Sequence, residues 1–376
     1  MSNQLVPHDL LQKADKILFV THLALGDFTY MQTYFAAFAR QYPHIKIHLW
    51  VDEVRRTRCF WKWDNLKRYV LYDWVRACSF FHKIYDQTYS VSLFKKSIQD
   101  AQAENYPIVV SLCTLRSEKY AKLARNLSPN GFVVGVRQPT RMLQFFTKLA
   151  YKKLDAALDV KKFANQGHIS NCYAAWFLEL FGLEVAEGSA RAPFVAIPRQ
   201  WISFAKLRFL MWGFDKRSQR FGKVFFINAF AKNDKRCWPL ENLFEVLTLI
   251  KQHDNWADIN FIVNVDPAEQ KRVQKFFASH SINSIVFFSA QYHFFQLPAI
   301  ISLCDLVISV ETSVIHLASA LKVPVVALMR QKNPEWVPWD LNNGELVMCA
   351  KRSDWIKDIP AKQVVKTIEE VVGRLS

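Results

Sequence analysis

The chain has 376 residues, which predicts two domains, and 51% of them are apolar, enough to fill two cores without a disulfide or a structural metal. Its formal net charge is +16. Seven cysteines without a C-x-x-C pair argue against both a disulfide framework and a zinc ribbon. No apolar run approaches the roughly 20 residues that span a bilayer, and the start lacks the apolar stretch of a signal peptide, so we expect a cytoplasmic protein.

The first half of the chain alternates strands and helices. Residues 16–20 are predicted to form a buried strand, followed by a loop with Gly26 and Asp27, a helix to about residue 40, and a strand at 45–51. Strand, helix and strand in this order form a βαβ unit, which implies a parallel sheet. Further strands are expected at 108–112 and 132–136, and residues 141–182 are expected to be largely helical.

The second half repeats this alternation. Apolar runs predict strands at 223–228, 260–265, 284–288, 306–310 and 325–329, with helices between them and a last helix at 361–375. The pattern weakens between residues 186 and 222, so we place the domains at 1–205 and 206–376. Two such domains predict a ligand in the cleft between them, near the carboxyl ends of the strands.

One of these strand ends carries a group suited to an anion. The strand at 306–310 leads into Glu311, Thr312, Ser313 and, one turn later, His316. A helix that starts with Thr312 or Ser313 presents free amides and the positive end of its dipole, which favours a phosphate. An ordinary helix cap with a hydrogen-bonded histidine is the alternative.

A basic loop follows the strand at 223–228. Lys232, Lys235 and Arg236 precede Trp238 and Pro239, and a cation in this position could bind a phosphate. A solvated charge run is the alternative for each of them taken singly.

Asp27 follows Gly26 at the end of the first predicted strand. A carboxylate there could remove a proton from an attacking hydroxyl, although helix capping is the more common role of such a residue.

The overall charge fits nucleic acid, an anionic membrane face or a phosphorylated substrate. Thirty Phe, twelve Trp and twelve Tyr accompany this charge, a composition that suits a membrane-interface surface or a binder of single-stranded nucleic acid. Near residue 60, basic side chains are interleaved with aromatic ones, which suits an anionic lipid, although an exposed basic loop is the alternative for each residue. The basic members are Arg55, Arg56, Arg58 and Lys62. No D-x-D motif occurs, so we expect no obligatory metal on a diphosphate and no cofactor.

Taken in order, these motifs resemble glycosyltransferase family nine, the ADP-heptose:lipopolysaccharide heptosyltransferases. The L-G-D turn at residues 25–27, the Tyr106–Leu112 strand with Arg116 after it, and the helix opening on His168 match the family pattern. So do the basic Trp-Pro segment at 235–239 and the signature at 311–324. Here the signature begins E-T-S rather than D-T-G.

The resemblance implies an α/β GT-B fold: two Rossmann-like domains with parallel sheets facing across a cleft, the first binding the acceptor and the second the nucleotide-sugar. It also implies an inverting, metal-independent transfer of a heptose from ADP-heptose to the lipopolysaccharide inner core, at the inner face of the inner membrane. Asp27 would be the general base, and Lys235 or Arg236 would hold the diphosphate. The other implied donor-binding residues are Glu269, Glu311, Thr312, Ser313 and His316.

The implied acceptor is an anionic lipid-linked saccharide bound by Arg55, Arg56, Arg58, Lys62 and Arg116. Another nucleotide-sugar donor, or a protein or capsule acceptor, remains an alternative. A basic aromatic nucleic-acid-binding protein is the alternative from a different class. Because the basic residues are scattered over both halves rather than set in one stripe, we expect no nucleic-acid partner.

Overall fold

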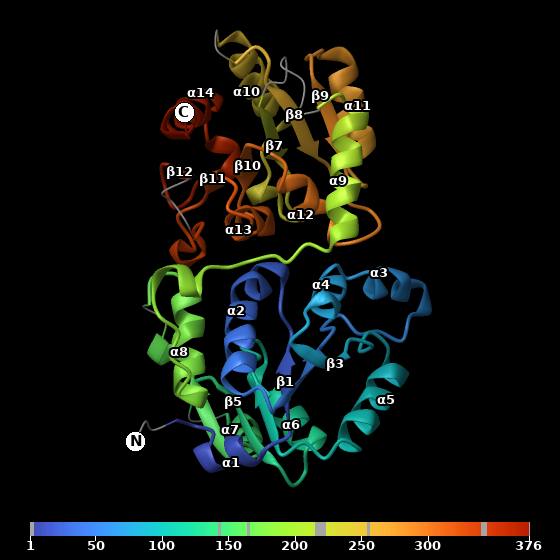
Figure 1. Cartoon of the computed structure of the whole chain (residues 1–376), viewed down its shortest axis with the longest axis vertical. Coiled ribbons are helices and arrows are strands. Elements are labelled where there is room, and N and C mark those ends of the chain that lie inside the picture. The colour runs from blue at the N-terminus through green and yellow to red at the C-terminus, as the bar shows by residue number, and fades with distance from the viewer. Residues whose placement is uncertain are drawn as a thin grey trace. The chain divides into compact units, whose positions relative to one another are not determined.

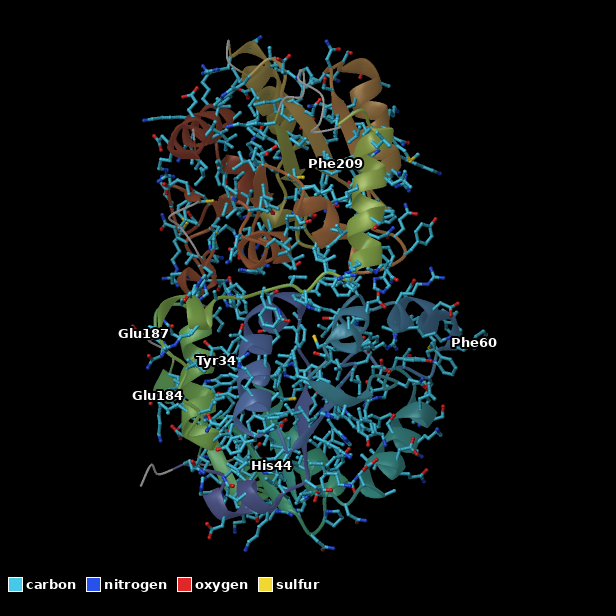
Figure 2. All side chains as sticks on the ribbon, in the orientation of Figure 1. Tyr34, His44, Phe60, Glu184, Glu187 and Phe209 are labelled. Atoms are coloured by element: carbon cyan, nitrogen blue, oxygen red, sulfur yellow. The ribbon has the colours of Figure 1, made fainter. Side chains whose placement is uncertain are left out.

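The computed structural model describes residues 4–141, 144–163, 166–214, 223–253, 256–339 and 344–375. The chain forms two compact units, Met1–Ala192 and Pro193–Ser376 (Figure 1). The predicted boundary at 205/206 falls inside helix α9 (Arg199–Met211), which packs against α12 (Gln296–Ile301) of the second unit. Phe209 of α9, labelled in Figure 2, is buried, and the ring of Trp201 stacks on His293 at 4.5 Å.

In the described part of the first unit, six strands form one parallel sheet in the order β3-β2-β1-β4-β5-β6. This is the strand order of a Rossmann fold. The strands are β1 (Lys16–Thr21), β2 (Lys46–Val51), β3 (Phe81–Tyr85), β4 (Ile108–Ser111), β5 (Phe132–Arg137) and β6 (Ala156–Asp159). The α-helices are α1 (His8–Lys13), α2 (Leu25–Gln41), α3 (Trp63–Lys67), α4 (Leu71–Ala77), α5 (Val91–Gln102), α6 (Ser117–Leu127), α7 (Phe145–Tyr151) and α8 (Ile169–Phe181). Short 3-10 turns lie at η1 (Phe60–Lys62), η2 (Val160–Phe163) and η3 (Gly188–Arg191).

Strand β1 is buried on both faces, because its side chains alternate between two sets of helices. Leu18 and Val20 belong to a core cluster that includes residues of α5 and α6. Phe19, between them, packs against rings of α2 and α8. Tyr34 of α2 (Figure 2) completes the α2–α8 contact by donating a hydrogen bond to the Ser170 carbonyl at 2.6 Å. The two helices are thereby held in a fixed register.

The second unit repeats this sheet. Its six described strands are parallel in the order β12-β11-β10-β7-β8-β9, which is the same order read from the other edge. They are β7 (Val224–Asn228), β8 (Asn260–Asn264), β9 (Ile285–Phe288), β10 (Leu306–Val310), β11 (Val325–Met329) and β12 (Glu345–Met348). Besides α9 and α12, the α-helices are α10 (Leu240–Gln252), α11 (Gln270–Ser279), α13 (Ser313–Ala320) and α14 (Ala361–Leu375). The 3-10 turns are η4 (Asp234–Arg236), η5 (Pro334–Trp336) and η6 (Ile356–Asp358).

The predicted α/β class and the parallel strands are confirmed. The helical prediction for residues 141–182 is confirmed at α7 and α8 and is wrong between them, where β6 pairs with β5. A four-residue edge strand of small and apolar residues cannot be told from a helix segment by periodicity. The edge strands β3 and β12 were also not predicted. Within the described residues, none of the helices combines the length and apolarity needed to cross a membrane.

The aromatic contact between β1, α2 and α8 should dominate the stability of the first unit. We expect Phe177→Ala, which removes a fully buried ring in contact with Phe19 and Phe35, to lower the free energy of unfolding by about 3–5 kcal/mol. Phe60→Ala is the matched control, because that ring is 69% exposed at the outer margin of the unit (Figure 2). Urea unfolding of both variants tests this, and equal losses would contradict the assigned core.

Candidate functional site

A buried polar network joins the carboxyl ends of three neighbouring strands in the second unit. The Asn228 side-chain amide at the end of β7 donates to the hydroxyls of Ser309 (3.1 Å) and Thr312 (3.0 Å). The Asn264 amide at the end of β8 donates to Asn228 Oδ1 at 2.8 Å. Because buried polar groups need partners, this network fixes the position of the loop that starts α13.

Helix α13 begins as the sequence predicted. Thr312 is its N-cap, and its hydroxyl accepts from the Val314 N–H at 3.3 Å. Ser313 is the first helical residue, and the buried His316 ring lies 5.5 Å from the Trp336 ring of η5. The start of α13 therefore presents a partial positive charge at the carboxyl edge of the sheet.

Glu311 has a protein partner for each carboxylate oxygen. Its side chain is buried, and Arg330, which directly follows β11, donates from Nε to Oε2 at 2.9 Å and from Nη2 to Oε1 at 3.2 Å. The Asn333 amide also donates to Oε1, at 3.3 Å. Such a bidentate pair is both specific and strong. A donor bound at Glu311, as the resemblance implies, would therefore meet a carboxylate that already accepts hydrogen bonds from Arg330 and Asn333.

The structure separates the two candidate phosphate-binding residues. Arg236 Nε lies 3.7 Å from Glu311 Oε1, too far for a hydrogen bond, and this buried nitrogen donates no hydrogen bond to any described residue. Lys235 is instead exposed and lies 5.3 Å from the centre of the Trp355 ring. Only Arg236 of this pair is thus brought next to Glu311 and Arg330.

The loop that carries these two residues is anchored at its end by Trp238. This side chain is buried and donates to the Ile359 carbonyl at 3.1 Å. The Cys237 thiol lies 3.1 Å from the Ala231 carbonyl and accepts from the Ala231 N–H at 3.3 Å, which closes the loop. Glu269 stands at the next strand end along the sheet, as the residue before α11, and pairs with Arg272 at 2.9 Å.

In the first unit, Asp27 lies in the first turn of α2 rather than in a loop before it. One carboxylate oxygen accepts from the Ala24 N–H at 3.1 Å, and the other accepts from the Tyr173 hydroxyl of α8 at 2.8 Å. Burial raises the pKa of Asp27 above its ordinary value of 3.8, while the Tyr173 hydrogen bond acts in the opposite direction. Asp27 therefore both caps the helix and is a better proton acceptor than an exposed aspartate.

The predicted acceptor-binding residues fall into two groups. Arg55 pairs with Glu53 through two hydrogen bonds of 2.7 and 2.6 Å, and Arg56 pairs with Asp52. These two guanidinium groups are already used within the unit. Arg58, Lys62 and Arg116 are exposed, and among the described residues none of these three makes an ion pair.

Two residues that the sequence analysis missed are Arg330 and Tyr173. Arg330 could have been found by asking which cation follows the strand next to β10 in a parallel sheet. Tyr173 lies on the predicted central helix, but only the packing of α8 on α2 brings its hydroxyl to Asp27.

Residues 209–357 match the family model described as Glycosyltransferase family 9 (heptosyltransferase). The matched stretch contains Arg236, Glu269, Glu311 and Arg330, so the strand-end cluster of the second unit lies within it. The predicted resemblance and the predicted enzyme class, a glycosyltransferase, are confirmed.

Solved structures share the fold along nearly the whole chain. A glycosyl transferase family 9 protein from Veillonella parvula DSM 2008 is 16% identical with a TM-score of 0.72, covering 95% of this chain and 97% of that one. E. coli ADP-heptose LPS heptosyltransferase II is 13% identical with a TM-score of 0.65, covering 96% and 99%. E. coli heptosyltransferase WaaC, solved with ADP, is 16% identical with a TM-score of 0.65, covering 95% and 99%.

These similarities confirm the predicted GT-B-type fold with two Rossmann-like units. No curated protein matches the chain.

Glu311 and Arg330 should depend strongly on each other, because loss of Arg330 leaves the buried Glu311 carboxylate with only the more distant Arg236 as a cation. We expect Arg330→Leu to lower the free energy of unfolding by about 3–5 kcal/mol and Glu311→Gln/Arg330→Leu to recover much of that loss. Arg374→Leu, which removes the partner of the exposed Glu345, should cost less than about 1 kcal/mol. Denaturant unfolding of the four proteins, wild type included, is the measurement. A double variant as unstable as Arg330→Leu would contradict the coupling.

Proposed function

We propose that this glycosyltransferase moves a heptose or a related sugar from ADP-heptose to the inner core of lipopolysaccharide, with inversion and without a metal. The observation that carries the proposal is the position of Arg236 beside Glu311 and the α13 segment, inside the stretch that matches the family 9 model. Another nucleotide-sugar remains the alternative, because Glu311 and Ser313 stand where the family signature has aspartate and glycine.

The donor diphosphate would bind to Arg236 and the first amides of α13. Arg236 and Arg330 carry two positive charges against the single negative charge of Glu311, so the cluster keeps a net charge of +1 for an anion. Arg236 also has an unused Nε–H, since it donates no hydrogen bond within the described chain. Thr312, Ser313 and His316 would complete the donor site, and Glu269 would accept from the ribose hydroxyls.

The transfer would begin with Asp27 accepting the proton of an acceptor hydroxyl. The hydroxyl oxygen then forms a bond to the anomeric carbon on the face opposite the leaving group. The bond from that carbon to the diphosphate breaks, and its electron pair leaves with the nucleotide. Positive charge from Arg236 and the α13 N-terminus stabilises the departing diphosphate, which is the role that a metal ion plays in other transferases.

The acceptor would be an anionic lipid-linked saccharide. The exposed and unpaired side chains of Arg58, Lys62 and Arg116 suit its phosphate or carboxylate groups. Arg55 and Arg56 would support this surface through their pairs with Glu53 and Asp52. Such an acceptor would place the protein in the cytoplasm, at the inner face of the inner membrane.

Removal of Arg236 should weaken the binding of ADP, whereas removal of its neighbour should not. We expect Arg236→Ala to raise the Kd for ADP by roughly 10-fold or more, because a charge-assisted contact to the diphosphate is lost. Lys235→Ala is the matched control and should change the Kd by less than about twofold, since Lys235 lies against Trp355. Calorimetric titration with ADP is the measurement. Equal effects of the two variants on the Kd would contradict the assignment of Arg236 to the diphosphate.

A base at Asp27 should control the acidic limb of the pH profile. We expect Asp27→Asn to retain ADP binding while turnover falls by about 100-fold or more. In wild type, kcat/KM should fall as the pH drops through the raised pKa of Asp27, because the carboxylate must be deprotonated to act. Tyr173→Phe removes a hydrogen bond that lowers this pKa, so the acidic limb should move to higher pH.

Tyr34→Phe is the control for this shift, because Tyr34 joins the same two helices and its hydroxyl bonds to Ser170 rather than to Asp27. The pH dependence of kcat/KM for wild type and both tyrosine variants is the measurement. An unmoved limb in Tyr173→Phe, or undiminished turnover in Asp27→Asn, would leave Asp27 as a helix cap only.

A further inference from the structure

Helix α7 of the first unit presents large apolar side chains to solvent. Phe145 is 66% exposed, Phe146 is 79% exposed and Leu149 is 46% exposed. The two phenylalanine rings contact each other edge to face, with their centroids 5.9 Å apart. Clustered apolar groups of this size on a surface mark a binding site more often than scattered ones do. We call these three residues the α7 surface.

The sequence around the α7 surface is basic throughout. Between Glu118 and Asp155 there is no acidic residue. The same stretch contains eight basic residues, which are Lys119, Lys122, Arg125, Arg137, Arg141, Lys148, Lys152 and Lys153. Of these, Arg125 pairs with Asp155 at 2.6 Å. Lys148 and Lys152 lie three residues after Phe145 and Leu149, so the helix places a lysine beside each of these apolar side chains.

The opposite side of α7 is fixed to the protein. Ala150 is buried, and α7 packs against α6. The Tyr151 hydroxyl lies 2.7 Å from the Ser117 hydroxyl and accepts from the Gln138 N–H at 3.2 Å. The exposed rings therefore project from a helix that is already anchored and need no refolding to reach a partner.

We propose that the α7 surface is where this protein contacts an anionic lipid bilayer, with Phe145, Phe146 and Leu149 in the interfacial layer and the lysines against the headgroups. Short basic helices with Phe and Leu on one side bind membrane interfaces by this combination. A bilayer meets both requirements of the α7 surface without a complementary shape, because it offers an apolar layer beneath negatively charged headgroups. The aliphatic Leu149 also favours lipid over the base stacking of single-stranded nucleic acid.

The proposal extends the membrane association of the proposed function to a named surface, and its test does not depend on the donor. Full-length protein is sedimented with vesicles of phosphatidylcholine alone or with about 30% phosphatidylglycerol. We expect wild type to bind the anionic vesicles preferentially. Lys148→Gln/Lys152→Gln should weaken binding by roughly 25-fold, because each of the two basic groups contributes about fivefold near a charged bilayer. Separately, Phe145→Ser/Phe146→Ser should weaken binding by roughly 10-fold or more, because two rings are lost from the interfacial layer.

Leu207→Ser/Leu210→Ser is the matched control, because these exposed side chains also lie on a basic helix, α9. It should bind vesicles like wild type. Full binding by Phe145→Ser/Phe146→Ser, equal loss in the control, or no preference of wild type for anionic vesicles would overturn the proposal. The proposal would also be overturned if wild type bound a single-stranded oligonucleotide but not vesicles, and if Phe145→Ser/Phe146→Ser abolished that oligonucleotide binding.

ADP titration of the same proteins separates this proposal from the proposed function. Loss of vesicle binding with unchanged ADP binding is the result expected of the α7 surface variants. If no protein in the set binds ADP while the vesicle results hold, the donor assignment fails and the lipid surface stands.

Discussion

The arrangement of the second unit's strand-end loops depends on the burial of one carboxylate. Glu311 follows β10 with its side chain almost inaccessible to solvent, and an ionised group in that position is costly unless a cation is provided. Arg330 provides it from the adjacent strand β11, with two hydrogen bonds. Arg236 lies in the loop after β7, the strand on the other side of β10. Its guanidinium is near a carboxylate that already accepts hydrogen bonds from Arg330. An arginine held in this way keeps hydrogen-bonding capacity for a ligand.

In the first unit, Asp27 is also a buried carboxylate, and its partner is a hydroxyl rather than a cation. Burial raises the pKa of Asp27, and the hydrogen bond from the Tyr173 hydroxyl offsets only part of that rise. The aromatic packing of α2 on α8 makes this contact possible, because it sets the register of the two helices. A buried ion pair suits a residue that must stay charged, whereas a hydroxyl partner suits a residue proposed to exchange a proton.

Much of the fold could be predicted because buried parallel strands are continuous apolar runs, as in β1, β7 and β10. The short edge strands β3, β6 and β12 could not, since half-exposed runs of four or five residues lack a distinctive period. The start of α13 at Thr312 or Ser313 was predicted because a helix start is a local feature, and Thr312 is the N-cap. Arg330 and Tyr173 were missed because they act on residues 19 and 146 positions away, through pairings that only the packed sheet and helices create.

The proposed transfer of a sugar from a nucleotide diphosphate is tested most directly by incubating the protein with a panel of nucleotide-sugars and following release of the nucleotide. We expect ADP-heptose, or one closely related nucleotide-sugar, to be consumed with release of its nucleoside diphosphate, and Asp27→Asn to slow this release. Consumption of no nucleotide-sugar in the panel, with no nucleoside diphosphate raising the thermal stability of the protein, would contradict the proposed transfer.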